Sequence, residues 1–219
     1  MRDAAETPTG PVSLAWDGPS DASNVVVMAP GAGGGMESRF MGALAAGIAS
    51  AGVRVCRFNF SYFEQGRRSP DRAPVLEDTY RAVVAQVRKW YSGSVVLGGK
   101  SMGGRIASHI VSSGERADGL FYLGYPLHPP GRPDRMRDAH LYSIEVPMLF
   151  VEGTRDPFCP LETLASVRAR LRAENRLVVI QDGNHSLEVR KSSGRSTTEA
   201  WAEASNAVSG WLKALQAWQ

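Results

Sequence analysis

Short apolar runs recur along the chain and alternate with longer segments of helical periodicity, and this alternation constrains the fold more than any other feature. Several of the runs are continuous, without polar residues at every second position. Such runs are typical of strands that are buried on both faces of a parallel sheet. We predict strands at Asn24–Met28, Val53–Phe60, Ser94–Leu97, Gly119–Leu123, Pro147–Val151 and Arg176–Ile180, and an antiparallel edge strand at Val12–Trp16.

The segments between these strands carry apolar residues three and four positions apart, as amphipathic helices do. We predict helices at Arg39–Ala51, Leu76–Trp90, Met102–Ser113, Leu161–Ala173 and from about Thr198 to Trp218. The alternation indicates an α/β fold with a doubly wound, mostly parallel sheet and right-handed crossovers. With 219 residues, 43% of them hydrophobic, the chain is expected to form a single domain over 1–219, with residues 1–10 flexible.

The composition argues against several classes of protein. The 25 Lys and Arg residues exceed the 22 Asp and Glu residues by too little, and lie too far apart, to predict a nucleic-acid partner. The two cysteines, Cys56 and Cys159, do not suggest a disulfide scaffold. The apolar runs are too short for a membrane span, and the N-terminal residues do not resemble a signal peptide. We therefore expect a cytoplasmic protein with no membrane partner.

The strongest functional signal is Gly99-Lys100-Ser101-Met102-Gly103, which has the spacing G-x-S-x-G. A predicted strand precedes it and a predicted helix follows it, which is the context of a nucleophile elbow. The turn is so tight that bulky residues two positions either side of the serine would clash, so glycine is needed there. We predict that Ser101 is a nucleophile and that the Met102 N–H stabilises the oxyanion.

Two other interpretations of this segment are weaker. Gly-Gly-Lys-Ser resembles the end of a phosphate-binding loop, but the required first glycine would fall on Ser94. The apolar residues Val95–Leu97, which would lie inside that loop, belong in a strand. The structural alternative is a glycine-rich turn in which Ser101 only caps the following helix.

A nucleophilic serine needs a base, and in these folds the partners follow in the order serine, acid, histidine. Among the four histidines, only His185 follows the final predicted strand, in a loop that reaches the carboxyl edge of the sheet. His109 lies in the helix after the elbow and is expected to be structural, whereas His128 and His140 lie in a long loop. His185 is therefore the predicted base.

Two aspartates compete for the role of the acid. Asp156 follows the strand Pro147–Val151 at the same edge of the sheet, where it can hold the imidazole tautomer. Asp182 lies only three positions from His185, and on the same loop it is poorly placed to reach the far ring nitrogen. We predict Asp156.

The glycine-rich segment Ala29–Met36 is expected to supply the second oxyanion donor, because glycine lets backbone amides approach a ligand closely. The Ala32 N–H is the first choice and the Gly33 N–H the second. Around the serine we expect a cleft lined by Met36, Tyr62 and His128. Arginines 67, 68 and 72 follow a strand at this edge, and Arg72 is a candidate for binding an acidic substrate group.

The segment Pro126–Val146 occupies the position where related folds insert a helical lid. Four prolines in its first half forbid a helix there, and the second half, Asp134–Tyr142, can form at most a short one. Neither half has the broad apolar face that would cover a long acyl chain. The sequence therefore predicts a shallow, open cleft with minimal or no lid.

Several blocks of the chain, in order, resemble α/β-hydrolases related to dienelactone hydrolase, and among these the branch of testis-expressed protein 30 and its bacterial relatives. The blocks are PGAGGGMESRFM, RFNFSYFEQGRRSPDRAP, GGKSMGGR, GYPLHPPGRPDRMRDAHL, FVEGTRDPF and DGNHS. The resemblance implies an α/β-hydrolase fold, hydrolysis of an ester-like bond, and Ser101, Asp156 and His185 as the catalytic triad. Many relatives carry histidine where this chain has Pro30, which puts the geometry of the oxyanion loop in question.

The predicted function is thus a serine hydrolase that acts on carboxylic esters or thioesters of a small molecule, through an acyl-enzyme and without a metal or cofactor. Two alternatives stay open: a hydrolase-like binding or scaffold module without turnover, and an acyltransferase. The sequence does not indicate the acyl group, the alcohol, any protein partner or the oligomeric state.

Overall fold

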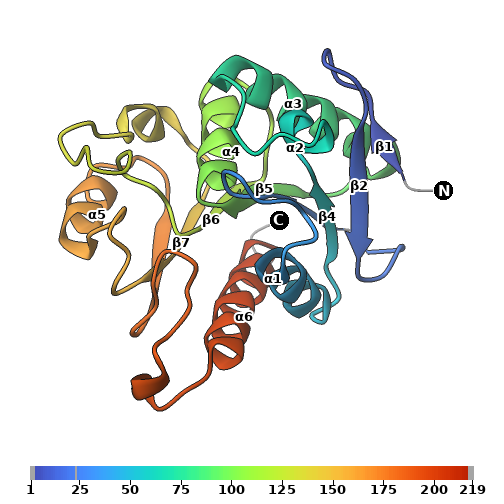
Figure 1. The fold of residues 1–219 in the computed structure, drawn as a ribbon. Coiled ribbons are helices and arrows are strands. Elements are labelled where there is room, and N and C mark those ends of the chain that lie inside the picture. Colours follow the sequence, from blue (N-terminus) through green and yellow to red (C-terminus); the bar gives the residue numbers. More distant parts are fainter. Residues whose placement is uncertain (1–2, 23, 217–219) are drawn as a thin grey trace.

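The computed structural model describes residues 3–22 and 24–216, which form one eight-stranded sheet with helices on both faces (Figure 1). The strand order is β1-β2-β4-β3-β5-β6-β7-β8. The strands are β1 (Ala4–Ala5), β2 (Val12–Asp17), β3 (Val25–Ala29), β4 (Arg54–Phe58), β5 (Val95–Lys100), β6 (Gly119–Leu123), β7 (Met148–Gly153) and β8 (Asn175–Ile180). Strands β3 to β8 are parallel, and β1 and β2 pair antiparallel.

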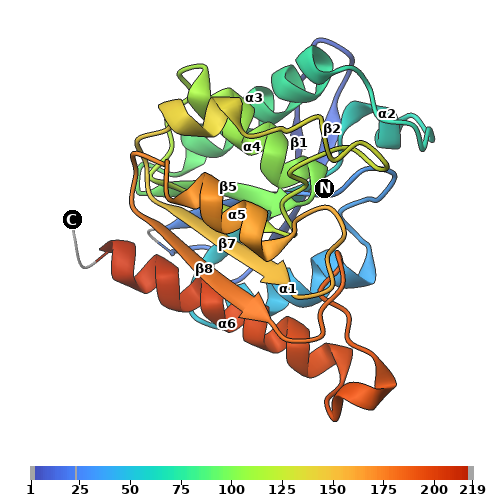
Figure 2. The same cartoon turned by 90° about the vertical axis from the view of Figure 1, so that its left-hand side faces the viewer.

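The helices cover the two faces unequally (Figure 2). Helices α1 and α6 pack together on one face, and α3, α4 and α5 lie on the other. The helical elements are α1 (Arg39–Ala49), α2 (Ser61–Glu64), α3 (Ala73–Trp90), α4 (Met102–Ser112), α5 (Leu161–Arg168), α6 (Thr197–Gln216) and two short 3₁₀ turns, η1 (Ala139–Ser143) and η2 (Lys191–Ser193).

Alternate residues of each central strand enter different cores, as a sheet buried on both faces requires. In β6, Leu120 and Tyr122 pack under α3, α4 and α5, whereas Phe121 and Leu123 pack under α1 and α6. All five residues of this strand are buried. The continuous apolar runs in the sequence therefore reflect burial on both sides of the sheet.

The predicted doubly wound α/β sheet is confirmed, and most elements differ from the prediction only at their ends. Strand β2 is antiparallel as predicted, but β1 lies outside it and forms the edge of the sheet. Within residues 1–10, which we expect to be flexible, Ala4–Ala5 instead form β1. The predicted end of the last helix at Trp218 lies outside the described residues.

The segment 126–146 crosses the carboxyl edge of the sheet without forming a lid helix. Its one regular element is η1, a single 3₁₀ turn close to the short helix that the sequence allows. Buried residues such as Leu127 and Leu141 tie the segment to the core. Among the described residues, none of the helices is both long enough and apolar enough to cross a membrane.

Candidate functional site

Ser101 lies at the turn between β5 and α4, in a backbone conformation that non-glycine residues rarely adopt (φ 50°, ψ −114°). The flanking glycines make this turn possible, because a Cβ atom at Gly99 would lie 2.2 Å from the Ala29 carbonyl oxygen. A Cβ atom at Gly103 would lie 2.4 Å from the same oxygen. The serine therefore stands at the carboxyl end of β5 and at the N-terminus of α4, where partial positive charge favours a developing anion.

The side chains of Ser101, His185 and Asp156 form a hydrogen-bonded chain. The Nε2 atom of His185 lies 2.8 Å from Ser101 Oγ, and its Nδ1 atom lies 2.7 Å from Asp156 Oδ2. Asp156 is buried, and its other oxygen accepts a hydrogen bond of 2.8 Å from the Phe158 N–H. This geometry fits a serine that can pass its proton to an imidazole whose tautomer is fixed by a carboxylate.

Asp182 is engaged elsewhere. Its Oδ1 atom lies 3.0 Å from Arg155 Nε, and Arg190 also forms an ion pair with it. The Arg190 side chain, by its hydrogen bond to the carboxylate, lowers the pKa of Asp182. Through these two arginines, Asp182 stabilises the loop after β8. Asp156, in contrast, contacts the histidine.

Lys100, the residue before the serine, stabilises the loop that carries His185. Its ammonium group donates a hydrogen bond to the His185 carbonyl oxygen and lies 5.6 Å from the ring centre of Phe40. Burial lowers the pKa of Lys100 to about 8. On the other side of the loop, Trp201 Nε1 donates a 2.9 Å hydrogen bond to the Ser186 carbonyl. No local pattern in the sequence predicts that Lys100 or Trp201 holds this loop.

A buried acid, Glu152, lies beneath the site at the end of β7. Its side chain accepts a 2.6 Å hydrogen bond from the Tyr125 N–H. Burial raises the pKa of Glu152 well above its ordinary value, because desolvation disfavours the charged carboxylate. Burial also raises the pKa of the neighbouring Cys159 thiol, with Glu152 and Asp156 adding to the effect. Cys159 therefore lacks the thiolate character of a nucleophile.

The glycine-rich loop after β3 is held by Asn59, which follows β4, and by Tyr62 of the short helix α2. The Gly33 N–H donates a 3.1 Å hydrogen bond to Tyr62 Oη, and the Met36 N–H donates one of 2.7 Å to Asn59 Oδ1. The Gly33 amide is thereby occupied, which favours Ala32 as the second oxyanion donor. Ala32 and Met102 both line the cavity beside Ser101.

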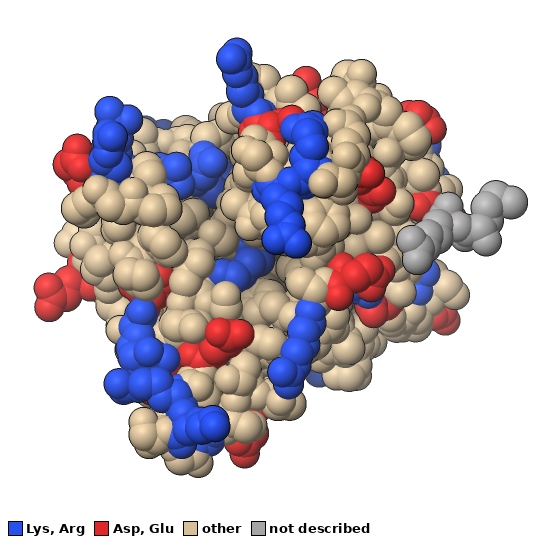
Figure 3. Space-filling model, viewed as in Figure 1, with Lys and Arg blue, Asp and Glu red and all other residues tan. Residues whose placement is uncertain are grey.

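A cavity of about 540 Å³ opens over the serine, in a face where basic side chains surround a hollow (Figure 3). His128, of the four predicted substrate-binding residues, lines this cavity. Met36 and Tyr62 are buried away from it and support the glycine-rich loop, and the exposed Arg72 does not line it. The lining comprises residues 31, 32, 70, 71, 73, 76, 100–102, 105, 126, 128, 130, 137, 158, 185 and 186.

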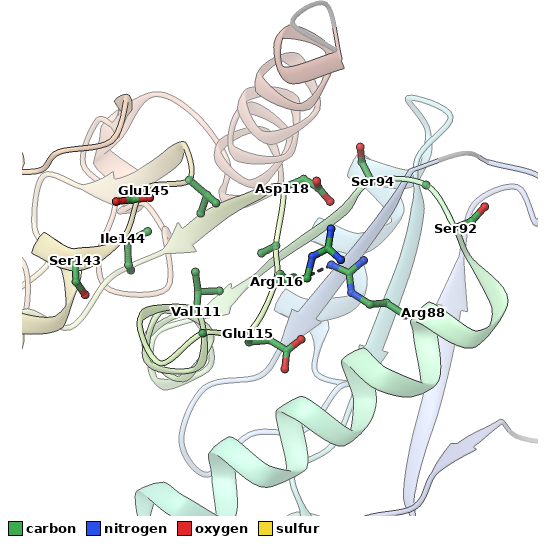
Figure 4. Close-up of a pocket in the computed structure, with 14 residues that line it drawn as sticks. Arg88, Ser92, Ser94, Val111, Glu115, Arg116, Asp118, Ser143, Ile144 and Glu145 are labelled. Carbon is green, nitrogen blue, oxygen red and sulfur yellow. Dashed lines mark hydrogen bonds between the residues drawn. The ribbon is translucent and has the colours of Figure 1, made fainter.

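A second cavity of about 590 Å³ lies at the opposite edge of the sheet, where β5, β6 and β7 begin (Figure 4). Its polar groups hold the chain in place: Arg88 donates to the Arg116 carbonyl oxygen, and Asp118 accepts from the Val95 N–H. Neither Ser101 nor His185 reaches this cavity. Within the described part of the chain, no group of three or more His, Cys, Asp or Glu residues could hold a metal ion.

Comparison with known proteins agrees with the fold. A family model described as an alpha/beta hydrolase domain matches residues 22–213. An α/β serine hydrolase without a lid from Xanthomonas campestris superposes with a TM-score of 0.74 and is 21% identical, over 96% of this chain and 94% of that one. A serine hydrolase homologue from Coxiella burnetii gives a TM-score of 0.76 at 18% identity, over 97% of both chains.

A third structure, dienelactone hydrolase from Anabaena variabilis, gives a TM-score of 0.72 at 18% identity and covers 94% of each chain. At such identities the solved structures establish a shared fold. They do not carry over a substrate.

Proposed function

Because the chain belongs to the α/β-hydrolase family, we propose that it is a serine hydrolase that cleaves carboxylic ester or thioester bonds of a small molecule. Ser101 is the nucleophile, His185 the general base and acid, and Asp156 the residue that orients the imidazole. The observation that carries the proposal is the continuous hydrogen-bonded chain from Ser101 Oγ through His185 to Asp156.

In the first half of the reaction, Ser101 Oγ attacks the substrate carbonyl carbon while His185 Nε2 accepts the hydroxyl proton. The carbonyl oxygen becomes an oxyanion, which the N–H groups of Ala32 and Met102 stabilise. The bond to the leaving alcohol or thiol then breaks, and the proton on His185 passes to that group. The acyl group remains bound to Ser101 as an ester.

In the second half, water takes the place of the alcohol. His185 accepts a proton from the water as its oxygen attacks the acyl carbon, and the second tetrahedral intermediate occupies the same oxyanion site. The bond to Ser101 Oγ breaks, and the serine recovers its proton from His185. The acid leaves, and the enzyme returns to its starting protonation state.

A binding or scaffold module is the second candidate, because a fold alone does not establish turnover. Turnover that depends on Ser101 discriminates between a hydrolase and a scaffold module. With 4-nitrophenyl butyrate and micromolar protein, we expect turnover that falls about 10³-fold or more in Ser101→Ala. Turnover that is equal in wild type and Ser101→Ala would overturn the proposal, and an absence of turnover would favour the scaffold. An added alcohol acceptor that takes the butyryl group in place of water would indicate an acyltransferase.

A further inference from the structure

Two arginines share the cavity with Ser101, and neither has a carboxylate partner. Arg105 extends from the first turn of α4, where its backbone N–H bonds the Ser101 carbonyl, and Arg137 extends from the segment 126–146. Within the described residues, neither guanidinium forms an ion pair, although arginines elsewhere in the chain do. A partly buried cation without a counter-ion is costly, so such sites usually serve to bind an anion.

The Arg105 side chain is only partly satisfied by the protein. One terminal nitrogen lies 3.1 Å from Nε2 of His109, which must be an unprotonated acceptor there. The buried Nε atom of Arg105 has no hydrogen-bond partner. The five N–H donors of a guanidinium are therefore far from fully used.

The two arginines act on each other and on the neighbouring imidazoles, and the Glu77 carboxylate, which lies 3.2 Å from His109 Nδ1, offsets part of the Arg105 charge. Burial, together with the charge of Arg105, lowers the pKa of Arg137. Burial, the neighbouring His109 and the Arg105 charge lower the pKa of His140 to about 3, so the imidazole stays neutral. The Arg105–Arg137 pair thus repels additional positive charge, and an anion between the two groups would relieve that repulsion.

One carboxylate, Asp71, also lines the cavity, and it limits the charge of the ligand. Its Oδ1 atom accepts a 2.7 Å hydrogen bond from the exposed Arg67, while its buried Oδ2 atom has no hydrogen-bond partner. A singly charged carboxylate meets less repulsion from Asp71 than a dianionic phosphate does. A carboxylate also matches the two-pronged geometry of a guanidinium.

We propose that Arg105 and Arg137 form a carboxylate-binding subsite. The substrates are esters that carry a free carboxylate, and this carboxylate binds the two arginines. This inference rests on the proposed function, and it names the substrate class of the same site. Arg105 and Arg137 are specificity residues, since they bind a part of the substrate that does not react. They also replace Arg72 as the residues expected to select acidic substrates.

The test compares 4-nitrophenyl hydrogen adipate with its methyl ester, two substrates that differ in one negative charge, with spontaneous hydrolysis subtracted. Wild-type protein should show a higher kcat/KM for the acid. The ratio of kcat/KM for acid over methyl ester should fall about tenfold or more in Arg137→Gln and in Arg105→Gln, mainly through KM. Arg137→Lys, which keeps the charge, should recover part of the ratio.

Arg72→Gln is the matched control, because it removes one exposed arginine near the same edge and should leave the ratio unchanged. A ratio that is the same in wild type, Arg105→Gln and Arg137→Gln overturns the subsite while leaving the hydrolase intact. If no variant turns over either ester, calorimetry with monomethyl adipate decides. Binding that weakens at least about tenfold in Arg137→Gln supports the subsite, and equal or undetectable binding in both proteins refutes it.

Discussion

At the scale of single residues, Asp156 and Asp182 lie at the same edge of the sheet but have different partners. Asp156 contacts Nδ1 of His185, whereas Asp182 contacts two arginines. An amide at position 156 would leave the imidazole in the wrong tautomer. An amide at position 182 would weaken only the ion pairs that stabilise the loop after β8.

We therefore expect Asp156→Asn to lower kcat for 4-nitrophenyl butyrate by about 10⁴-fold. Asp182→Asn should lower it by less than about tenfold, because Asp182 makes no contact with the histidine side chain. Steady-state kinetics of the two purified variants, with matched circular dichroism spectra, measure this difference. The reverse order of effects would make Asp182 the orienting acid.

Glu152 provides a residue-scale test of stability. Its carboxyl group has a pKa raised above the ordinary value of 4.5, so the native state keeps a proton that the unfolded chain releases as pH rises. The contribution of Glu152 to stability is therefore largest below about pH 4.5 and is lost as pH rises toward the native pKa. Glutamine keeps the shape and does not titrate.

The free energy of unfolding of Glu152→Gln should thus increase relative to that of wild type as pH rises from about 4.5 to 8. Urea denaturation at several pH values measures the difference. The exposed Glu145→Gln serves as the control for losing one carboxyl group. Parallel stability curves for wild type and Glu152→Gln would show that Glu152 is ionised in the native state.

At the scale of elements, helices α1 and α6 approach each other closely at one glycine. A Cβ atom at Gly47 would lie 2.3 Å from Ser205 Oγ, whereas a Cβ atom at Gly42, in the same helix, would meet nothing within 4 Å. Both positions would gain helix propensity from alanine. Only Gly47 would also force the two helices apart.

Gly47→Ala should therefore destabilise the protein by about 1–3 kcal/mol. Gly42→Ala should stabilise it by up to about 1 kcal/mol. Chemical denaturation measures both, and Gly47→Ala combined with Ser205→Gly should recover much of the loss. Equal effects of the two alanines would contradict the tight α1–α6 contact.

The elements that the sequence predicts well are those whose burial is reflected in the local pattern. Strand β6 is confirmed at both ends, since all of its residues are buried. Helix α3 begins three residues before the predicted Leu76, because Pro74 in its first turn favours helix initiation while the apolar stripe begins later. Helix α5 ends at Arg168 although the apolar pattern continues to Ala173, because the chain turns there and Arg168 bonds Asn175 at the start of β8.

The site was less predictable where it depends on side-chain direction. The spacing of elements predicts that Ser101, Asp156 and His185 meet, because they follow parallel strands. It could not predict that Tyr62 points beneath the glycine-rich loop, that Lys100 bonds the His185 carbonyl, or that Arg105 faces the cavity. These contacts join segments far apart in the sequence and leave no local pattern.

At the scale of the whole molecule, the carboxyl edge of the sheet carries the cavity, and no helical insertion in the described part of the chain covers it. The segment 126–146 contributes Pro126, His128, Pro130 and Arg137 to the wall of the cavity and forms only one 3₁₀ turn. An uncovered cavity offers little apolar surface to a long acyl chain. The rate of ester hydrolysis should also not depend on a lid that opens at a lipid surface.

A series of 4-nitrophenyl esters from acetate to decanoate tests this architecture. We expect the highest kcat/KM between acetate and butyrate, and no increase in rate above the critical micelle concentration of the longer esters. A maximum at decanoate, or a jump in rate at the micelle concentration, would reveal an acyl tunnel or a closing segment.

Covalent labelling tests whether Ser101 is an activated nucleophile. A fluorophosphonate phosphonylates a serine whose hydroxyl has a base beside it, and peptide mass spectrometry locates the adduct. We predict one adduct per chain, on Ser101, with labelling abolished in Ser101→Ala and strongly slowed in His185→Ala. An unlabelled wild-type protein, or labelling that persists at another serine in Ser101→Ala, would show that Ser101 is not the activated nucleophile.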